Sequence, residues 1–594
     1  MSKAGGMLRS LLKRAVFLLL ALLGTLALLR CPILKVEKEL PMESIRIVEA
    51  YPDRAFYRPG EKVRLLVYLT SELSRPVAIR LRATICFLVS EVCRIEHVIT
   101  VQPGDQWHEL LWDPPPQHPT GYGVDLQVLD RQGTTLSMAS TSFDVLERWT
   151  QAPRYGFLTD FSPGRMQVEE TMDWLIRYHI NGLQFYDWMY RHEELLTSQE
   201  PYRDPLGRLL SRRTVEALID AAHRRNIAAM PYTAIYGASV SFYKTHPDWA
   251  LYKAGGRPIP FGENFLYIMD PSPDSPWTEH LLSEFSEVMQ GTKFDGIHLD
   301  QYGDPKSGFD AQGEPVNLAE AIPAFINLTK DVVTSYKADA TVVFNAVNNW
   351  PIETVAPAKQ DLVYIEVWPP HTLYQDLWKV IVNAQRLGGG KLVVLAAYVE
   401  PARHRNVRLT DAVIFASGGY HIELGERNGM LADPYFPKYQ QMSNELAAVV
   451  RRYYDFAVRY ENVLAEGTWD TTEQQGANVF IEGVQTDPRL VYKKVWAVTR
   501  AGPGFETISL INLLGIANPE WSGLLVSDPP MQENLCVRYY TAERIRRVWL
   551  ASPDLEMPSA VLLSFECKQD ARPYVEFKVP KLIYWDLLVV EYGA

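Results

Sequence analysis

Two acidic residues stand at the ends of apolar runs that break into aromatic, Gly and Pro residues. Asp300 closes the run Phe294-Asp-Gly-Ile-His-Leu-Asp300, and Glu366 lies within Tyr364-Ile-Glu366-Val-Trp368. Each run predicts a strand, and in a barrel of parallel strands the strand ends form the rim where active sites are built. Two carboxylates facing each other across a rim lined with Trp and Tyr are suited to breaking glycosidic bonds, because that reaction uses a pair of carboxyl groups.

Strand alternation predicts that both acids point into the barrel. Tyr364, Glu366 and Trp368 share one face of their strand, and His298 and Asp300 share one face of theirs. A lone Asp at a strand end more often caps the next helix. That alternative is weaker for Glu366, because the Val-Trp-Pro-Pro that follows it does not start a helix.

The surroundings of the two acids predict different roles for them. Asp300 has His298, Gln301 and a Tyr-Gly-Asp turn beside it, a polar setting in which a nucleophile stays ionised. Glu366 lies between two aromatic residues and precedes two prolines, an apolar setting that keeps a general acid protonated. We therefore predict Asp300 as the nucleophile and Glu366 as the acid/base. Carboxyl groups about 5–5.5 Å apart would imply retention of the anomeric configuration, and a wider gap would imply inversion.

Further polar and aromatic residues near the predicted rim are candidate sugar ligands. The block 185–192 closes the second strand with aromatic, acidic and basic side chains, for which a buried ion pair is the alternative. Asn345 faces inward on the fifth strand, where its amide can bind a 2-hydroxyl group. No Cys/His cluster has zinc-site spacing and the loop 303–314 lacks the EF-hand pattern, so we expect neither a metal nor another cofactor. Glu423 is a weak candidate; the predicted substrate-binding residues are Tyr186, Asp187, Trp188, His192, His298, Gln301, Asn345, Trp368 and Tyr398.

The elements that must position these residues alternate between strand and helix from about 151 to 457. Eight strands with helices between them predict a (β/α)8 TIM barrel. A doubly wound open sheet is the alternative, but no Gly-rich phosphate turn follows any strand. The stretch 236–293 predicts a decorated loop over the active face. The predicted strands are 155–161, 182–187, 227–234, 294–300, 341–347, 361–368, 391–400 and 419–425, and the clearest helices are 166–178, 212–225, 318–336 and 373–387.

The regions on either side of the barrel read as all-β. Alternating apolar runs separated by Gly and Pro predict an Ig-like β-sandwich over 41–150 and a second, antiparallel β-sandwich over 458–594. The fold class is therefore multidomain α/β, with a central TIM barrel flanked by β-domains. Cys86 and Cys93 are close enough in the sequence to bridge a β-hairpin, and a disulfide between Cys536 and Cys567 would join two C-terminal strands, although free thiols fit equally well.

The first 40 residues predict a targeting segment. Lys3, Arg9, Lys13 and Arg14 precede the unbroken apolar run Ala15–Leu29, which is typical of a secretory signal peptide or a signal anchor. The run is short for a full membrane span of about 20 residues. No small-x-small cleavage site follows, which favours an uncleaved anchor. We expect a protein outside the cell or at its surface, with the membrane as a partner if the segment stays attached.

Composition narrows the choice of partner. The net charge of -12 argues against a nucleic-acid partner, because binding phosphates needs a basic surface. The chain has 15 Trp and 31 Tyr. Aromatic rings form flat platforms that suit sugar rings. Core packing is the alternative, and it accounts for most of these residues.

These motifs resemble glycoside hydrolase family 66, the dextranases and cycloisomaltooligosaccharide glucanotransferases. The resemblance spans about 44 to 594 and is strongest in the barrel. The resemblance implies a retaining mechanism on α-1,6-glucan, with Asp300 as nucleophile and Glu366 as acid/base. The run Tyr51-Pro-Asp-Arg-Ala-Phe-Tyr-Arg-Pro-Gly60 is similar to the family's N-terminal signature, and its barrel motifs are matched by Tyr155-Gly-Phe-Leu-Thr-Asp-Phe161, Tyr186-Asp-Trp188 and Asp295-Gly-x-x-x-Asp300.

Two departures from the family bear on the activity. The family usually has Gly-Asp-Thr at the nucleophile, whereas this chain has Leu299-Asp300-Gln301. The glucanotransferases carry a carbohydrate-binding insert after the seventh strand, where this chain has only 401–408, so hydrolysis is favoured over cyclisation. The alternatives are a transglycosylase, another retaining α-glycosidase, or a non-catalytic surface protein that binds glycans.

Overall fold

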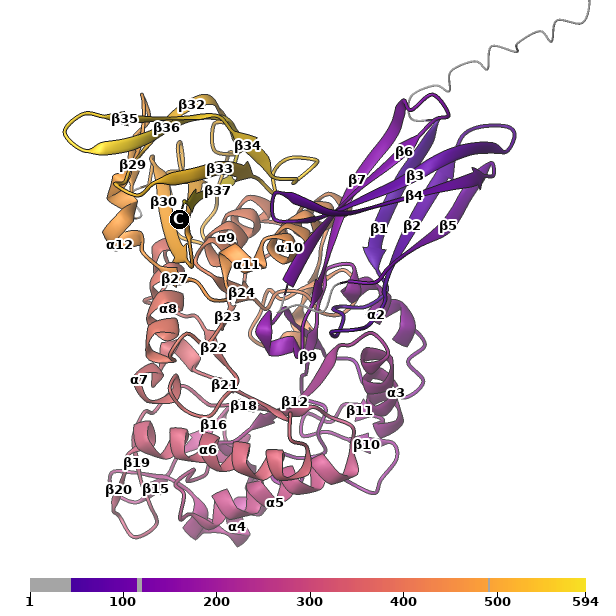
Figure 1. Cartoon of the computed structure of the whole chain (residues 1–594). Coiled ribbons are helices and arrows are strands. Elements are labelled where there is room, and N and C mark those ends of the chain that lie inside the picture. Colours follow the sequence, from indigo (N-terminus) through magenta and orange to yellow (C-terminus); the bar gives the residue numbers. More distant parts are fainter. Residues whose placement is uncertain (1–43, 115–119, 490–491, 594) are drawn as a thin grey trace, which may run out of the picture.

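A computed structural model of the chain describes residues 44–114, 120–489 and 492–593. A central barrel is flanked by two regions of antiparallel sheet. Figure 1 shows both regions on the same side of the barrel, with α10 (Asn444–Arg459) and α11 (Glu461–Leu464) between them. The predicted targeting segment 1–40 lies outside the described residues. Within the described ranges, no helix is both long and apolar enough to cross a bilayer.

Two antiparallel sheets form the N-terminal region. Burial alternates along β2, where Val63, Leu65, Val67 and Leu69 are fully buried. The buried faces of the two sheets enclose one apolar core, as in a β-sandwich. The sheets have the orders β1-β2-β5 (Ile45–Pro52, Val63–Ser71, Gly104–Trp112) and β4-β3-β6-β7 (Ser90–Val101, Val77–Phe87, Thr120–Leu129, Thr135–Val145).

The barrel is an 8-stranded parallel sheet whose strands follow one another in chain order. A backbone hydrogen bond of 3.1 Å from the N–H of Phe157 to the carbonyl of Leu424 brings the last strand back to the first. This closure excludes the doubly wound open sheet. Every strand lies within its predicted range: β8 (Tyr155–Leu158), β9 (Gly182–Phe185), β12 (Ala228–Ala234), β18 (Gly296–Asp300), β21 (Thr341–Asn345), β22 (Leu362–Glu366), β23 (Val393–Ala396) and β24 (Gly419–His421).

Helices pack around the barrel, and their starts carry the expected signals. Ser211 accepts a hydrogen bond from the N–H of Thr214 and caps α3, while Ser275 followed by Pro276 starts α5. The four helices predicted most clearly are all present. The outer helices are α2 (Val168–Ile176), α3 (Arg212–His223), α5 (Pro276–Gly291), α6 (Leu318–Tyr336), α8 (Tyr374–Leu387) and α9 (His404–Ala416), with a short α7 (Ile352–Val355).

The stretch 236–293 is only partly a loop, which corrects the prediction. Its last part is α5, an ordinary barrel helix. The part before α5 follows β12 and pairs with the loop that follows β18, so it lies on the rim to which the carboxyl ends of these strands point. It contains α4 (Val240–Thr245) and the small sheet β13-β17-β16 (Gly237–Ser239, Leu266–Ile268, Pro260–Phe261). It also supplies β15 and β14 (Arg257–Pro258, Tyr252–Lys253) to the sheet β15-β14-β19-β20, whose strands β19 and β20 (Gly308–Phe309, Pro315–Val316) belong to the loop after β18.

Two sheets also form the C-terminal region around a core of their own. The larger has the order β27-β30-β31-β37-β33-β34 (Trp469–Asp470, Val495–Gly502, Phe505–Asn512, Trp585–Tyr592, Ile545–Ala551, Val561–Leu563), with β29 (Thr486–Asp487) beside β30. The smaller has the order β28-β32-β36-β35 (Val479–Ile481, Gln532–Tyr540, Pro573–Leu582, Phe565–Gln569). The division points at 150 and 457 stay predictions.

The cysteines in the described part of the chain are free thiols. β36 lies between β32 and β35, so it separates Cys536 from Cys567. In the N-terminal hairpin, Cys93 pairs with Ile85 rather than with Cys86. Neither of the two disulfides considered from the sequence is therefore formed.

Candidate active site

Asp300 and Glu366 are the last residues of β18 and β22, and Asn345 ends β21 between them. The side-chain amide nitrogen of Asn345 donates to Asp300 Oδ1 at 2.8 Å and to Glu366 Oε2 at 3.0 Å. These two oxygens can be no further apart than the sum of the two distances, about 5.8 Å. The acids therefore face each other on one rim, within the range of separations that glycosidases use.

The remaining carboxylate oxygens are held by tyrosines. Tyr232 donates its hydroxyl to Asp300 Oδ2 at 2.8 Å, and Tyr398 donates to Glu366 Oε1 at 2.8 Å. Each oxygen of the pair thus accepts at least one hydrogen bond from a side chain on the barrel wall. Both acids are partly exposed, so their carboxylates are fixed in orientation while remaining accessible from the rim.

Burial raises the pKa of both acids. The pKa of Asp300 is raised to about 7, first by desolvation and then by the nearby charge of Glu366, against the hydrogen bonds from Tyr232 and Asn345 that lower it. The pKa of Glu366 is also raised, again mainly by desolvation. Two carboxylates this close disfavour double ionisation, because each negative charge raises the pKa of the other.

This result corrects the argument that Asp300 occupies a polar setting. His298 lies below the rim at 1% exposed, and its pKa is lowered to about 3 by desolvation. The side-chain amide of Gln301 donates to the carbonyl of Trp350 at 2.8 Å. Neither side chain is free to solvate Asp300. The two roles therefore stay predictions that the polarity of the surroundings does not decide.

Several predicted ligands surround the acids. Tyr398 and Asn345 bind them directly, and Trp368 packs against Tyr398 with ring centroids 5.7 Å apart. Tyr186 lies 4.8 Å from the ring of Tyr232, centroid to centroid. Asn345 is buried, and its amide nitrogen donates to both carboxylates. Its role in this structure is therefore to position the two acids rather than to bind a sugar.

Three of the predicted ligands are almost fully buried, and their role as sugar ligands stays a prediction. Trp188 is 3% exposed and packs on Phe294 with ring centroids 4.7 Å apart, so its face is covered by the core. His298 is enclosed by aromatic rings inside the barrel. Gln301 is 4% exposed and its side chain is tied to backbone groups.

Asp187 and His192 stay open as ligands. Asp187 forms the kind of ion pair considered as the alternative, with Arg208 at 3.2 Å. Its pKa is raised to about 7, mainly by desolvation. His192 is buried, its pKa is lowered to about 4 by desolvation, and its Nδ1 has no hydrogen-bond partner. No contact joins either residue to the paired acids within the described ranges.

Sequence reasoning missed Tyr232, Tyr435 and Phe436. Tyr232 pairs in register with His298 across β12 and β18, so the alternation that pointed His298 inward would also have pointed Tyr232 inward. Phe436 stacks on Tyr186 with ring centroids 4.4 Å apart, and Tyr435 contacts the same ring edge-on. Tyr435 and Phe436 come after the last barrel strand, at the start of the short 3-10 helix Phe436–Lys438. So short an element has no periodic pattern from which the sequence could predict their positions.

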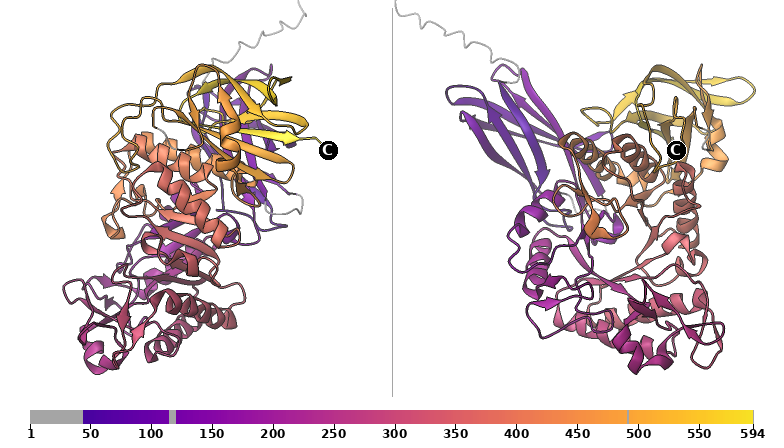
Figure 2. Two further views of the ribbon diagram at one scale, coloured as in Figure 1. Left: turned by 90° about the vertical axis from the view of Figure 1, so that its left-hand side faces the viewer. Right: turned by 180° about the vertical axis from the view of Figure 1, so that it is seen from behind.

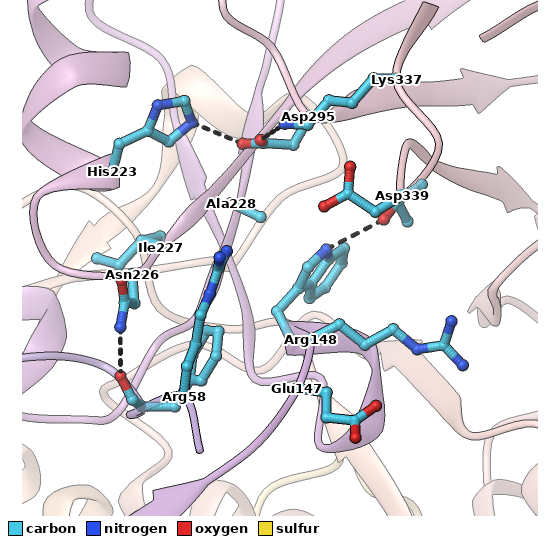
Figure 3. A pocket seen from close by; sticks show the side chains of 13 residues that line it. Arg58, Glu147, Arg148, His223, Asn226, Ile227, Ala228, Asp295, Lys337 and Asp339 are labelled. Carbon is cyan, nitrogen blue, oxygen red and sulfur yellow. Dashed lines mark hydrogen bonds and ion pairs between the residues drawn. The ribbon is translucent and has the colours of Figure 1, made fainter. Parts of the chain in front are cut away.

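A cavity of about 230 Å³ lies at the opposite end of the barrel (Figure 3). Its lining includes Asp295, Thr341 and Ala228, which stand at the amino ends of their strands. Asp295 binds His223 at 2.8 Å and also Lys337. Because active sites of such barrels form at the carboxyl ends of the strands, we interpret this cavity as part of the structural base.

One group of possible metal ligands occurs in the described ranges, and it is separate from the acid pair. Asp411, His421 and Glu423 bring their ligand atoms within 4.8 Å of one another, fully buried between β24 and α9. His421 Nδ1 lies 2.9 Å from Asp411, and its Nε2 lies 2.9 Å from the carbonyl of Ala397. Burial raises the pKa of Glu423 to about 8. A proton held by this carboxyl group reduces the negative charge that the three residues bring into the core. Glu423 contacts Asp411 and His421 in this buried group, and its role as a sugar ligand stays a prediction.

Comparison with known proteins supplies relatives for this architecture. The family model described as glycosyl hydrolase family 66 matches residues 52–589. A cycloisomaltooligosaccharide glucanotransferase from Niallia circulans is 25% identical over 98% of this chain and 75% of its own length. A dextranase from Streptococcus salivarius is 24% identical over 80% of this chain and 67% of its own. A cycloisomaltooligosaccharide glucanotransferase from Paenibacillus sp., solved with cycloisomaltoheptaose, has a TM-score of 0.86 at 22% identity, covering 92% of this chain and 100% of that one.

Proposed function

Because this chain belongs to glycosyl hydrolase family 66, we propose that it cleaves α-1,6-glucosidic bonds in dextran-like glucans and retains the anomeric configuration. The observation that carries the proposal is the acid pair bridged by Asn345. An oxygen separation of at most about 5.8 Å is close to the distance of about 5–5.5 Å used by retaining enzymes. It leaves little room for the water that an inverting enzyme places between its acids.

In the proposed reaction Asp300 attacks the anomeric carbon of the bound glucan. Glu366 gives its proton to the glycosidic oxygen, which leaves as the hydroxyl group of the released chain. In the second step Glu366 takes a proton from water, and the resulting hydroxide displaces Asp300 from the glycosyl-enzyme. The raised pKa of Glu366 suits the first step, because the acid must hold a proton near neutral pH.

Two observations support hydrolysis of an α-1,6-glucan. The relatives named above include a dextranase and glucanotransferases that form cycloisomaltooligosaccharides. Between β23 and α9 this chain has only residues 397–403, so it has no insert at the place where the resemblance puts the glucanotransferases' carbohydrate-binding domain. Transglycosylation and cleavage of another α-glucan are the alternatives. A non-catalytic glycan-binding protein is disfavoured, because both acids are present and paired.

We further propose that the enzyme is exported and works outside the cell or at its surface. The support is the basic N-terminus followed by the apolar run Ala15–Leu29. Fusing residues 1–40 to a reporter tests export. A reporter that stays wholly in the cytoplasm would reject it.

Incubation of the full-length protein with dextran, pullulan, starch and α-mutan tests the activity. Sizing of the products over time should show dextran shortened to a mixture of linear isomaltooligosaccharides. The Asp300→Ala and Glu366→Ala variants are the matched controls and should leave dextran intact. Cyclic products would assign a glucanotransferase, and cleavage of a different glucan would reject the α-1,6 specificity.

A further inference from the structure

Trp469 is an exposed indole with no ring partner. All the tryptophans lie in described segments, and only Trp107 at 47% and Trp469 at 55% are strongly exposed. Trp107 stacks on Tyr68 with ring centroids 4.7 Å apart. Trp469 makes no ring contact within the described ranges. A single exposed apolar side chain is ordinary on a protein surface, so the case for a ligand depends on the hollows that Trp469 lines.

The backbone holds Trp469 rigidly. It belongs to β27, where it pairs with Ala501 of β30. The next residue, Asp470, accepts hydrogen bonds from Trp378 Nε1 at 2.9 Å and from the hydroxyl of Thr472 at 2.8 Å. The backbone that carries the indole is therefore fixed, so binding to the indole costs little ordering of the main chain.

Trp469 lines two hollows of about 650 Å³ each. The first runs along the outer face of α8 and includes Asn383 and Gln474. The second extends over the C-terminal sheet and includes Tyr540 and Arg572. Both volumes fall in the range of ordinary ligand sites. An exposed indole between two hollows offers a groove for an elongated ligand.

The charges that line the two hollows show no excess of basic residues: the second hollow has Glu506, Glu543 and Arg572. The first hollow has two basic residues, Lys379 and Arg386, and two acidic residues, Asp470 and Glu473. A balanced set of charges gives no net attraction to an anion, while the amide and carboxylate groups can bind hydroxyl groups. An aromatic face with polar groups around it is the chemistry that recognises a sugar ring.

We propose that Trp469 and these two hollows form a second binding site for a neutral glucan chain, away from the acid pair. α8 runs back from the rim carrying Glu366 and spans about 21 Å at 14 residues. The first hollow also includes Gly389 and Gly390, which follow the far end of α8. The site goes beyond the proposed function: it tethers a long chain on the flank of the barrel and leaves the catalytic step unchanged.

Binding to dextran by full-length protein tests the site. The Asp300→Asn background removes turnover, so that affinity can be measured by electrophoresis in gels containing dextran. Trp469→Ala should weaken binding about five- to tenfold, and Trp469→Tyr should restore most of it. Trp107→Ala, the matched exposed tryptophan, should leave binding unchanged. In the active enzyme, Trp469→Ala should raise KM for long dextran without changing kcat, and kinetics on an activated aryl α-glucoside should not change.

A second variant distinguishes loss of the binding site from loss of the fold. Glu473→Ala combined with Gln474→Ala changes only exposed side chains of the first hollow, and it should weaken binding in the same direction at an unchanged melting temperature. Unchanged affinity in both variants would overturn the site. So would a dimer seen by light scattering that Trp469→Ala dissociates without any effect of glucan. Trp469-dependent binding to pullulan or starch, without dextran cleavage, would support the site and reject the proposed bond specificity.

Discussion

At the scale of single residues, one amide nitrogen holds the two acids in place. Asn345 donates to both carboxylates, and its bond lowers the pKa of Asp300. We predict that Asn345→Ala lowers kcat on dextran about 100-fold, because both carboxylates lose their common anchor. The acid limb of the kcat/KM profile should also move to higher pH. Unchanged kinetics and profile, in a variant with the wild-type melting temperature, would show that the bridge is incidental.

The roles of the acids can be separated by chemical rescue. We predict that Asp300→Ala and Glu366→Ala both lose activity on dextran, and that azide rescues both on an activated α-glucoside. In Glu366→Ala the covalent intermediate still forms, and azide attacks it to give the α-azide. In Asp300→Ala azide occupies the emptied pocket and displaces the leaving group once, which gives the β-azide.

NMR of the azide products identifies the anomer and therefore the mechanism. The opposite pairing of variant and anomer would mean that the roles are exchanged. Full dextran cleavage by either variant would remove that residue from the mechanism. The experiment matters because the raised pKa values of both acids do not distinguish nucleophile from acid.

The raised pKa of Asp300 implies a stability cost. Its folded value of about 7 exceeds the ordinary value near 3.9. Between these two pH values the folded state therefore binds more protons than the unfolded state. Stability is therefore fully present below about pH 4 and falls as pH rises to about 7. We predict that Asp300→Asn is more stable than wild type at pH 8 by about 1–2 kcal/mol, since partial exposure screens part of the effect. Thermal melts at pH 4 and pH 8 test this prediction. A stability difference between the variant and the wild type that is equal at both pH values would contradict it.

Alternation along strands predicted which side chains face the barrel interior but not how deep they lie. His298 and Asp300 share a face, yet His298 is 1% exposed because it sits one layer below the rim. Beyond the last strand residue the rule no longer applies. Asp187 has a φ of 55°, which turns the chain and sends Trp188 into the core instead of the pocket.

At the scale of elements, the base of the barrel depends on Asp295, just before β18. It accepts from His223 and Lys337, and the N–H of Ala229 donates to it at 2.7 Å. These bonds outweigh burial and lower its pKa. Its stabilisation is present above the unfolded pKa near 3.9 and is lost as pH falls through the lower folded value.

We predict that Asp295→Asn destabilises the protein by about 2 kcal/mol at pH 7, because three donors lose a charged acceptor. The loss should shrink as pH falls below the unfolded pKa near 3.9, because the wild-type carboxylate then becomes protonated in its turn. Activity per folded molecule should stay the same, because the residue lies at the end opposite the acids. A loss of kcat at an unchanged melting temperature would contradict this structural role.

The sequence predicted long elements better than short ones. Eight apolar runs and four clear helical patterns were enough to identify the barrel, because each element spans several periods. The two-residue strands β14, β15, β19 and β20 are too short to show a period. α5 was absorbed into a predicted loop, although Ser275 and Pro276 mark its start. Tyr435 and Phe436 come from a turn, so only the folded chain brings them to the site.

At the scale of the whole molecule, both β regions are attached to the barrel by apolar contacts and by ion pairs. The C-terminal sheet adds Trp496, Trp549 and Trp585 to the apolar core of the barrel. The N-terminal sandwich has its own core, adds Tyr51, Ala55 and Phe56 to the core of the barrel, and also forms ion pairs with the barrel and α10. Glu49 binds Arg177 at 2.9 Å, and the carboxylate of Asp125, on β6, binds Arg459 at 2.7 Å.

The most buried of these ion pairs is the sharpest test of the N-terminal attachment. Arg154 is 1% exposed and lies 2.7 Å from Asp144 and 3.6 Å from Glu461. Arg154→Met keeps most of the volume but leaves two buried acids without a cation. We predict that the free energy of unfolding falls by about 3–5 kcal/mol, seen as a lower melting temperature.

The control is Arg46→Met, which breaks an exposed ion pair with Glu72 and should change the free energy of unfolding by less than about 0.5 kcal/mol. Adding Asp144→Asn to Arg154→Met should recover part of the loss, because one unpaired charge is removed. A stable single variant would mean that apolar contacts alone hold the sandwich on the barrel.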